Sequence, residues 1–309
     1  MLETYICSDC PRNCSKPRGS GFCGMGNSAR VARAAPHFGE EPCISGTRGS
    51  GTVFFSGCNL RCVFCQNRAI SAGGFGKDLS VSELRDVFLR LRDSGVHNLS
   101  LVTGSHFVRQ IAEALSGLDL GIPVVWNSSG YDSLTALRQL AGLVQVYMPD
   151  LKYLTPALAR TYSAAPDYPQ VATAAIAEMY RQVGPFQLDA DGLLQRGVLI
   201  RHLILPGWLD NSFDVMDWVA AQFPGKAVLF SLMSQFTPMP HCPPELQRSL
   251  TQEEYDRCRS YLELSGIENG FFQELDAAGT EMIPAFDLTG VEHGCAPGRY
   301  QPSANNTVS

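Results

Sequence analysis

Short apolar runs alternate with amphipathic segments from Gly51 onward, and this alternation restricts the chain to folds built from repeated βα units. The apolar runs predict six strands, over residues 52–57, 98–103, 122–128, 144–152, 198–205 and 227–233. Helices are expected between them, at residues 106–115, 134–141, 168–183 and 213–222. The pattern therefore predicts an α/β architecture in which each strand leads into a helix.

Capping boxes mark two further helices. Ser80 is followed by Glu83 at the spacing of a capping box, and an apolar series at helical spacing follows, comprising Leu84, Val87, Phe88 and Leu91. Thr251 and Glu254 repeat the box near the C-terminus. We therefore expect one helix after Ser80 and another after Thr251.

Composition and charge narrow the class of protein. Apolar residues make up 45% of the 309 residues and charged residues 17%, which is typical of a globular protein. No run of about 18 apolar residues could span a bilayer. The net charge of −6, without any Lys/Arg-rich run, opposes binding to a phosphate backbone. We expect neither a membrane nor a nucleic acid as a partner.

The N-terminal sequence and the cysteine content indicate in which cellular compartment the protein is located. The first residues, MLETYICSDCPRNC, contain neither the basic region nor the apolar region of a signal peptide. Eleven cysteines in an unexported chain favour metal chemistry under reducing conditions over disulfides. A cytoplasmic location is expected.

Changes in composition divide the chain into three parts. Residues 1–50 are rich in Cys, Gly, Pro and Arg and have little hydrophobic periodicity, so a Cys-rich, loop-dominated N-terminal extension is predicted there. Residues 51–290 contain the βα pattern. Residues 291–309 form a tail whose end, QPSANNTVS, has no large apolar residue and is expected to be disordered.

Three cysteines stand close together directly after the first predicted strand. Cys58, Cys62 and Cys65 lie in the stretch SGCNLRCVFCQN, a C-x3-C-x2-C triplet. Three thiolates can hold three irons of a [4Fe-4S] cube and leave the fourth iron open to a small chelating ligand. A zinc site completed by a distant His, or simply packed thiols, are the alternatives, but no second C-x2-C follows downstream.

Four more cysteines crowd the N-terminal extension. Cys7, Cys10, Cys14 and Cys23 form C-x2-C-x3-C-x8-C in a segment too polar to make its own core, which is typical of a metal-stapled knuckle. Four thiolates would close the coordination sphere, so such a site is structural or transfers electrons. Zinc, a second iron–sulfur cluster and reduced free thiols remain alternatives. The isolated Cys258 is expected to lie in the core.

Several stretches resemble the radical S-adenosylmethionine (radical SAM) superfamily, and within it the PflX-like proteins related to pyruvate formate-lyase activating enzyme. The matching stretches are CPRNC, HFGEEPCISGTRGSGTVFFSGCNLRCVFCQN, VVWNSSGYDS, VYMPDLKY and IRHLILPG. The resemblance implies a partial (β/α)6 barrel with its chemistry at the carboxyl ends of the strands. It also implies a [4Fe-4S] cluster on the cysteine triplet and SAM as the ligand of the open iron.

The resemblance implies three contacts to SAM. Asp150 occupies the position of the DLK motif in glycyl-radical activating enzymes, and Asn127 that of their TNG segment near the ribose. Arg201 resembles the arginine that faces the SAM carboxylate, a role that suits a guanidinium. A turn cap at Asp150 and a turn before Gly130 at Asn127 are the structural alternatives. His202 should point to the opposite face of the strand from Arg201.

One segment departs from the family pattern. Many members carry a GGE-like segment after the second strand, which receives the SAM amino group. This chain has residues 103–106, Thr-Gly-Ser-His, without a carboxylate. Hydroxyls and backbone carbonyls of this loop are the expected substitutes.

The resemblance also implies an activity. An external one-electron donor of the flavodoxin or ferredoxin type would reduce the cluster, SAM would be cleaved to methionine and a 5'-deoxyadenosyl radical, and the radical would take hydrogen from a target. A glycine of a partner glycyl-radical enzyme is the expected target, and another peptide or a small molecule is the alternative. The hypothesis from a different class is a non-catalytic iron–sulfur or zinc protein, because fold does not establish function.

Overall fold

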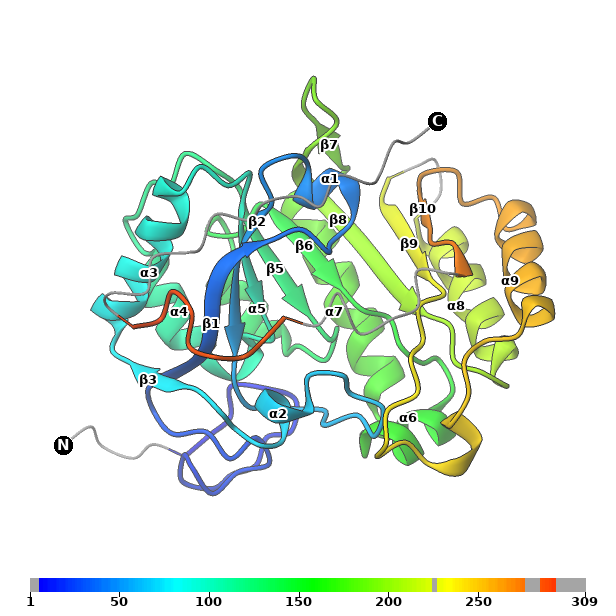
Figure 1. Ribbon diagram of the computed structural model, residues 1–309, viewed down its shortest axis with the longest axis horizontal. Coiled ribbons are helices and arrows are strands. Elements are labelled where there is room, and N and C mark those ends of the chain that lie inside the picture. Colours follow the sequence, from blue (N-terminus) through cyan, green and yellow to red (C-terminus); the bar gives the residue numbers. More distant parts are fainter. Residues whose placement is uncertain (1–5, 224–226, 276–283, 293–309) are drawn as a thin grey trace.

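The six predicted strands are the centre of the fold. A computed structural model describes residues 6–223, 227–275 and 284–292. All six strands are present and parallel to their neighbours, in the spatial order β9-β8-β6-β5-β4-β2. They are β2 (Ser50–Phe55), β4 (Leu99–Val102), β5 (Val124–Ser128), β6 (Val146–Pro149), β8 (Leu194–Leu203) and β9 (Leu229–Met233). The α/β class and the parallel sheet of a partial barrel are confirmed (Figure 1).

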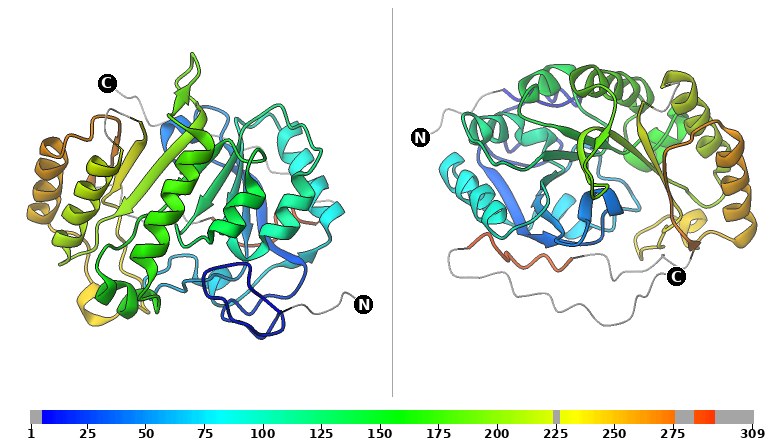
Figure 2. Two further views of the ribbon diagram at one scale, coloured as in Figure 1. Left: turned by 180° about the vertical axis from the view of Figure 1, so that it is seen from behind. Right: turned by 90° about the horizontal axis from the view of Figure 1, so that it is seen from above.

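Helices cover the outer, convex face of the curved sheet (Figure 2). They are α3 (Val81–Asp93), α4 (Val108–Leu115), α5 (Leu134–Leu140), α7 (Tyr168–Val183), α8 (Leu209–Gln222) and α9 (Gln252–Leu264), with the short η1 (Ser105–Phe107) before α4. Both predicted capping boxes are formed, at Ser80 with Glu83 and at Thr251 with Glu254. The shorter α2 (Arg68–Ser71) and α6 (Pro156–Ser163) lie at the carboxyl ends of the strands.

Four strands extend the sheet beyond the predicted six. They are β1 (Ala29–His37), β3 (Lys77–Leu79), β7 (Gln187–Leu188) and β10 (Gly270–Phe272). β1 pairs antiparallel with β2 and with β3, while β10 pairs parallel with β9. The Cys-rich extension expected over residues 1–50 is present, but it contains a strand that the sequence did not predict. Pairing with β2 stabilises this strand, β1, which is rich in Ala and Arg and has little β-propensity of its own.

The short helix α1 (Pro42–Ser45), also unpredicted, fills the amino-terminal end of the barrel. Its Ile44 is fully buried against inward-facing strand residues, among them Val125, Met148 and Leu199. Side chains alternate along a strand, so the next inward positions, Asn127, Asp150 and Arg201, lie one layer closer to the carboxyl ends. The barrel interior is thus apolar at its amino-terminal end and polar closer to the carboxyl ends of the strands.

Part of one prediction falls outside the description. The predicted C-terminal tail lies beyond the residues that the structure describes from residue 293 onward. Within the described ranges, no helix is both long enough and apolar enough to cross a membrane.

Candidate functional site

The cysteine triplet lies on the loop that follows β2, at the carboxyl end of the sheet (Figure 1). Gly57 begins this loop with φ at 78°, and a Cβ there would lie 2.4 Å from Cγ of Met25. Only glycine satisfies both conditions at little cost. The backbone N–H of Val63 donates to the carbonyl of Tyr162 at 2.9 Å, which attaches the loop to the end of α6. The loop is therefore held from both sides.

Hydroxyl groups accompany two of the thiols. The Ser163 hydroxyl donates to Sγ of Cys62 at 3.0 Å, and Oγ of Ser71 lies 3.3 Å from Sγ of Cys65. Burial raises the pKa of the Cys62 thiol to about 12, against the lowering effect of the Lys152 cation. A thiol in such surroundings binds metal as the thiolate and releases its proton on binding. The loop thus presents buried thiols with neighbours that can donate to thiolate sulfur.

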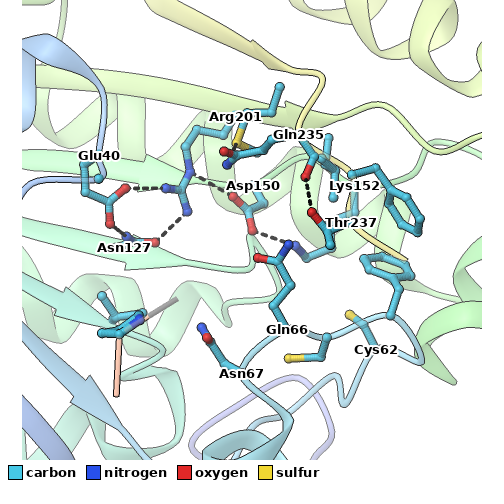
Figure 3. A pocket seen from close by; sticks show the side chains of 18 of the residues that line it. Glu40, Cys62, Gln66, Asn67, Asn127, Asp150, Lys152, Arg201, Gln235 and Thr237 are labelled. Atoms are coloured by element: carbon cyan, nitrogen blue, oxygen red, sulfur yellow. Dashed lines mark hydrogen bonds and ion pairs between the residues drawn. The ribbon is translucent and has the colours of Figure 1, made fainter. Parts of the chain in front are cut away.

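Cys62 and Cys65 open on a cavity of about 260 Å³ that also contains the three residues expected to contact SAM (Figure 3). Asn127, Asp150 and Arg201 line it, although they come from three different strands. Apolar rings complete the lining, from Phe54, Phe64 and Phe236. Polar and charged side chains thus share the lining with apolar ones, which suits a ligand that has both charged and apolar parts.

Arg201 connects the polar side chains of this cavity. Its guanidinium donates to Asp150 at 3.0 Å, to Oδ1 of Asn127 at 2.8 Å and to Glu40 at 2.8 Å. The side chains of Arg201, Glu40 and Asp150 are only 13, 10 and 15% exposed. Asn127 lies within β5, and the Asp150 carboxylate contacts Arg201 and Lys152.

Lys152 gives Asp150 a second cationic partner. Its Nζ lies 2.6 Å from Oδ2 of Asp150. Burial raises the pKa of Asp150, but Lys152 and Arg201 outweigh this effect and hold the pKa below its usual value. Burial likewise lowers the pKa of Lys152, and Asp150 outweighs it, so the pKa of the amine is raised overall. Both groups are charged at neutral pH.

Two members of this polar layer had no role assigned from the sequence. Lys152 lies in the matching stretch VYMPDLKY, and Glu40 lies in HFGEEP, 161 residues from its partner Arg201. Glu40 also accepts a hydrogen bond from the amide of Asn127 at 3.0 Å. Burial raises the pKa of the Glu40 carboxyl, against the opposing effect of Arg201. The signal that could have found Glu40 is the pair of carboxyl residues, Glu40 and Glu41, before the short segment 42–45.

His202 lies on the other face of β8, as the alternation of a strand requires. Its Nδ1 is 2.6 Å from the carbonyl of Leu151 and its Nε2 is 2.9 Å from the hydroxyl of Ser212 on α8. Burial lowers its pKa to about 4, so the ring is neutral and structural. The prediction that only one of this pair looks into the barrel is confirmed.

The loop at residues 103–106 does not supply side chains to the cavity, which corrects the expectation that its hydroxyls replace the GGE-like segment. Val102 lines the cavity, but the four following residues do not. His106 is fully buried, with Nε2 2.8 Å from the carbonyl of Ser56, and burial lowers its pKa to about 4. His106 of this loop thus supports the end of β2.

The four N-terminal cysteines line a second, much smaller space. Cys7, Cys10, Cys14 and Cys23 surround it together with Arg12 and Asn59. All ten cysteines at described positions are free thiols. Cys258 is fully buried in the core, as predicted. The four N-terminal cysteines that are close together in the sequence thus also lie around one space in the fold, and Cys258 lies apart from them.

The family can now be stated. Residues 52–216, more than half of the chain, match the radical SAM superfamily domain, and the protein belongs to that superfamily. The family implies a [4Fe-4S] cluster and SAM, and the residues present fit both: cysteines without disulfides open on a cavity that has cationic, anionic and aromatic walls.

Three known proteins are similar to this chain. An uncharacterized protein from Methanocaldococcus jannaschii is 29% identical over 278 residues, which cover 85% of this chain and 75% of that protein. The structure of SuiB from Streptococcus suis aligns with a TM-score of 0.50 at 12% identity over 76% of this chain, and this chain spans about half (49%) of the length of SuiB. A domain of pyruvate-formate lyase-activating enzyme from Bacteroides vulgatus aligns with a TM-score of 0.36 at 12% identity, covering 63% of this chain and 91% of that domain. The likeness to SuiB supports the fold alone.

Proposed function

We propose that this protein reductively cleaves SAM and uses the resulting 5'-deoxyadenosyl radical to take hydrogen from a target. The observation that carries the proposal is the shared cavity, because Cys62 and Cys65 open on the same space as Asp150, Lys152 and Arg201. A [4Fe-4S] cluster with one open iron supplies the electron and the chelation site for the amino acid end of SAM. The protein supplies orientation, charge and exclusion of water.

Each group of residues has a part in this proposal. Cys58, Cys62 and Cys65 hold the cluster, and the hydroxyls of Ser163 and Ser71 stabilise two of the thiolates. Lys152 and Arg201 place positive charge where a carboxylate would bind.

Further groups would position the rest of SAM. Asp150 and Asn127 offer oxygen acceptors for hydroxyl or amino groups. Phe64 and Phe236 offer an apolar surface for a base and keep water from the reacting atoms.

The target is proposed from the sequence motifs. The stretches that resemble the PflX-like branch favour a glycine in a partner glycyl-radical enzyme as the hydrogen donor, with a flavodoxin-type or ferredoxin-type protein as the reductant. Modification of another peptide or of a small molecule is the second candidate, because radical SAM scaffolds host many reactions. A glycyl radical detected by electron paramagnetic resonance (EPR) on a candidate partner would decide between them.

Two further assignments belong to this proposal. The thiols of Cys7, Cys10, Cys14 and Cys23 bind a metal centre, either zinc or a second cluster, since they surround one space. The protein works in the cytoplasm, because ten free thiols and an oxygen-sensitive cluster require a reducing compartment.

The test is SAM cleavage by protein reconstituted with iron and sulfide and reduced with dithionite. We expect 5'-deoxyadenosine from the native protein and none from Cys62→Ala, because the cube loses one of its three protein ligands. Cys258→Ala is the matched control, since Cys258 is also a buried thiol but lies on α9, in the apolar core. Native protein with a full, reduced cluster and no 5'-deoxyadenosine would instead favour a non-catalytic electron carrier.

A further inference from the structure

Glu40 reaches the cavity from a segment that precedes the matched superfamily domain, residues 52–216. The chain leaves β1 at His37 and crosses the amino-terminal end of the barrel through α1 before β2 begins. The backbone N–H of Glu40 donates to the hydroxyl of Ser45 on α1 at 3.1 Å. Ile44 anchors the same helix in the apolar end of the barrel. The position of Glu40 is therefore set by a helix outside the matched domain and not by a barrel strand.

Glu40, Asn127 and Arg201 form a closed ring of three hydrogen bonds (Figure 3). Nη1 of Arg201 donates to Oε2 of Glu40 at 2.8 Å, and Nη2 of Arg201 donates to Oδ1 of Asn127 at 2.8 Å. Nδ2 of Asn127 donates to Oε1 of Glu40 at 3.0 Å and completes the ring. A guanidinium only donates and an ionised carboxylate only accepts, so the two partners together allow one orientation of the Asn127 carboxamide. Glu40 thus determines which way the oxygen and the nitrogen of Asn127 face.

The ring also orders the charged groups beside it. Nε of Arg201 donates to Oδ1 of Asp150 at 3.0 Å, and Oδ2 of the same carboxylate lies 2.6 Å from Nζ of Lys152. A planar guanidinium that donates from all three of its nitrogens has little freedom to turn. The side chain of Glu40 is only 10% exposed, so water has little access to replace it as a partner of Arg201. Glu40 therefore acts, through Arg201, on both Asn127 and Asp150.

We propose that Glu40 is a positioning residue of the SAM site, which holds Arg201 and Asn127 in the orientation that receives SAM. The inference rests on the function proposed above. Both carboxylate oxygens of Glu40 have partners inside the ring, so its effect on SAM is exerted through those two side chains. Glutamine would offer one acceptor and one amino group in place of two acceptors. Its amino group would face an N–H donor of either Arg201 or Asn127, so the ring would lose a hydrogen bond.

The first experiment measures SAM binding without turnover, by calorimetric titration of reconstituted protein whose cluster is kept oxidised. Glu40→Gln should keep the native iron content and bind SAM at least about tenfold more weakly than the native protein. Glu41→Gln is the matched control, because Glu41 is also buried but does not line the cavity, and it should bind SAM almost as the native protein does. Native affinity in Glu40→Gln, or equal losses in the two variants, would overturn the proposal.

Two further outcomes concern the native protein and the fold. Native protein that binds SAM but forms no 5'-deoxyadenosine would remove the proposed function and leave the role of Glu40 standing, whereas native protein that binds no SAM would overturn both. Glu40→Asp covers the case in which Glu40→Gln does not fold. It keeps the negative charge beside Arg201, but its shorter side chain does not reach both Arg201 and Asn127, so SAM binding should weaken here too. Native affinity in this variant would count against the proposal.

The second experiment separates positioning from a general structural role. With dithionite as reductant, Glu40→Gln should raise KM for SAM at least about tenfold and leave kcat within about threefold of the native value. Asn127→Ala removes the carboxamide that Glu40 orients, and residues that act together are not additive. The double variant Glu40→Gln/Asn127→Ala should therefore bind SAM nearly as well as the weaker of the two single variants. A fall in kcat alone, or two losses that multiply in the double variant, would overturn the positioning role.

Discussion

Arg201 is the residue on which the charges of the cavity depend. It is the shared partner of Glu40 and Asp150, which are both largely buried, and the Lys152 amine pairs with Asp150. Burial lowers the pKa of Arg201, but Asp150, Glu40 and Glu41 outweigh this effect and raise it, so the guanidinium stays charged. Removing one partner of a buried ion pair is costly because the other charge remains in a poorly solvated place.

Replacing Arg201 tests this view. We expect Arg201→Met to lower the free energy of unfolding of the metal-free protein by about 3–5 kcal/mol, since Glu40 then lacks its cation. Arg201→Lys should lose less because the charge remains while the forked contacts do not. Chemical denaturation measures both. Arg259→Met, which breaks a pair with Glu263 in which both side chains are more than half exposed, should change little. A similar loss at positions 259 and 201 would contradict the buried network.

Some residues of this cavity could be predicted from the sequence and others could not. The difference depends on whether the signal for a residue is local in the sequence. Asn127 and Asp150 could be found because each closes an apolar run, and Arg201 because its stretch, IRHLILPG, resembles a motif of the family. Glu40 could not, because its role depends on a contact with a strand 161 residues away. Position in a repeating pattern is readable from sequence, whereas a partner across the barrel is not.

At the scale of elements, local signals decided what could be predicted. Helices with capping boxes and apolar stripes were placed correctly, and α7 has the predicted bounds of 168–183. β1 and α1 were missed because neither carries such a signal. β1 owes its conformation to pairing with β2, and α1 owes its burial to the strands around Ile44. Tertiary contacts override weak local preferences in both cases.

The start of α9 offers a test that depends on pH. The carboxylate of Glu254 accepts hydrogen bonds from Arg248 and from the backbone N–H groups of Thr251 and Gly207. The Arg248 contact is the largest of these effects, and together they lower the pKa of Glu254 from 4.5 to about 2. A carboxyl group with a lowered folded-state pKa stabilises the fold above its unfolded pKa and loses that contribution as pH falls toward the folded value.

We therefore expect Glu254→Gln to reduce the free energy of unfolding at pH 7. The difference from the native protein should shrink once the pH falls below 4.5 and should close near pH 2. Urea denaturation at several pH values measures the difference. Glu253→Gln is the matched control, because Glu253 is an exposed neighbour at the same helix start. A difference that is independent of pH would argue against this role of the carboxylate.

At the scale of the whole molecule, the metal centre proposed for the N-terminal cysteines would couple metal binding to folding in one region more than in the rest. The barrel has a large apolar core between sheet and helices, whereas residues 7–28 depend on thiols that face each other. A segment that a metal orders becomes mobile when the metal is removed.

Limited proteolysis should make this difference visible. In protein stripped of iron and zinc, we expect early cuts within residues 7–28 and a resistant fragment that contains the barrel. Reconstitution should slow these cuts at least tenfold and change cleavage elsewhere much less. Mass spectrometry of the fragments locates the sites. Equal cutting of the segment with and without metal would mean that its packing against the cluster loop suffices to order it.

The order of strands runs from β10 at one end to β3 at the other, and these two do not pair with each other in the described part of the chain. A sealed ring of strands admits a reactant only through its mouths. An incomplete ring of strands is also open at the side, between its two end strands. The size of a macromolecule therefore does not by itself exclude it from the reacting centre. A folded partner could offer a single exposed loop from the side and keep the rest of its own structure intact.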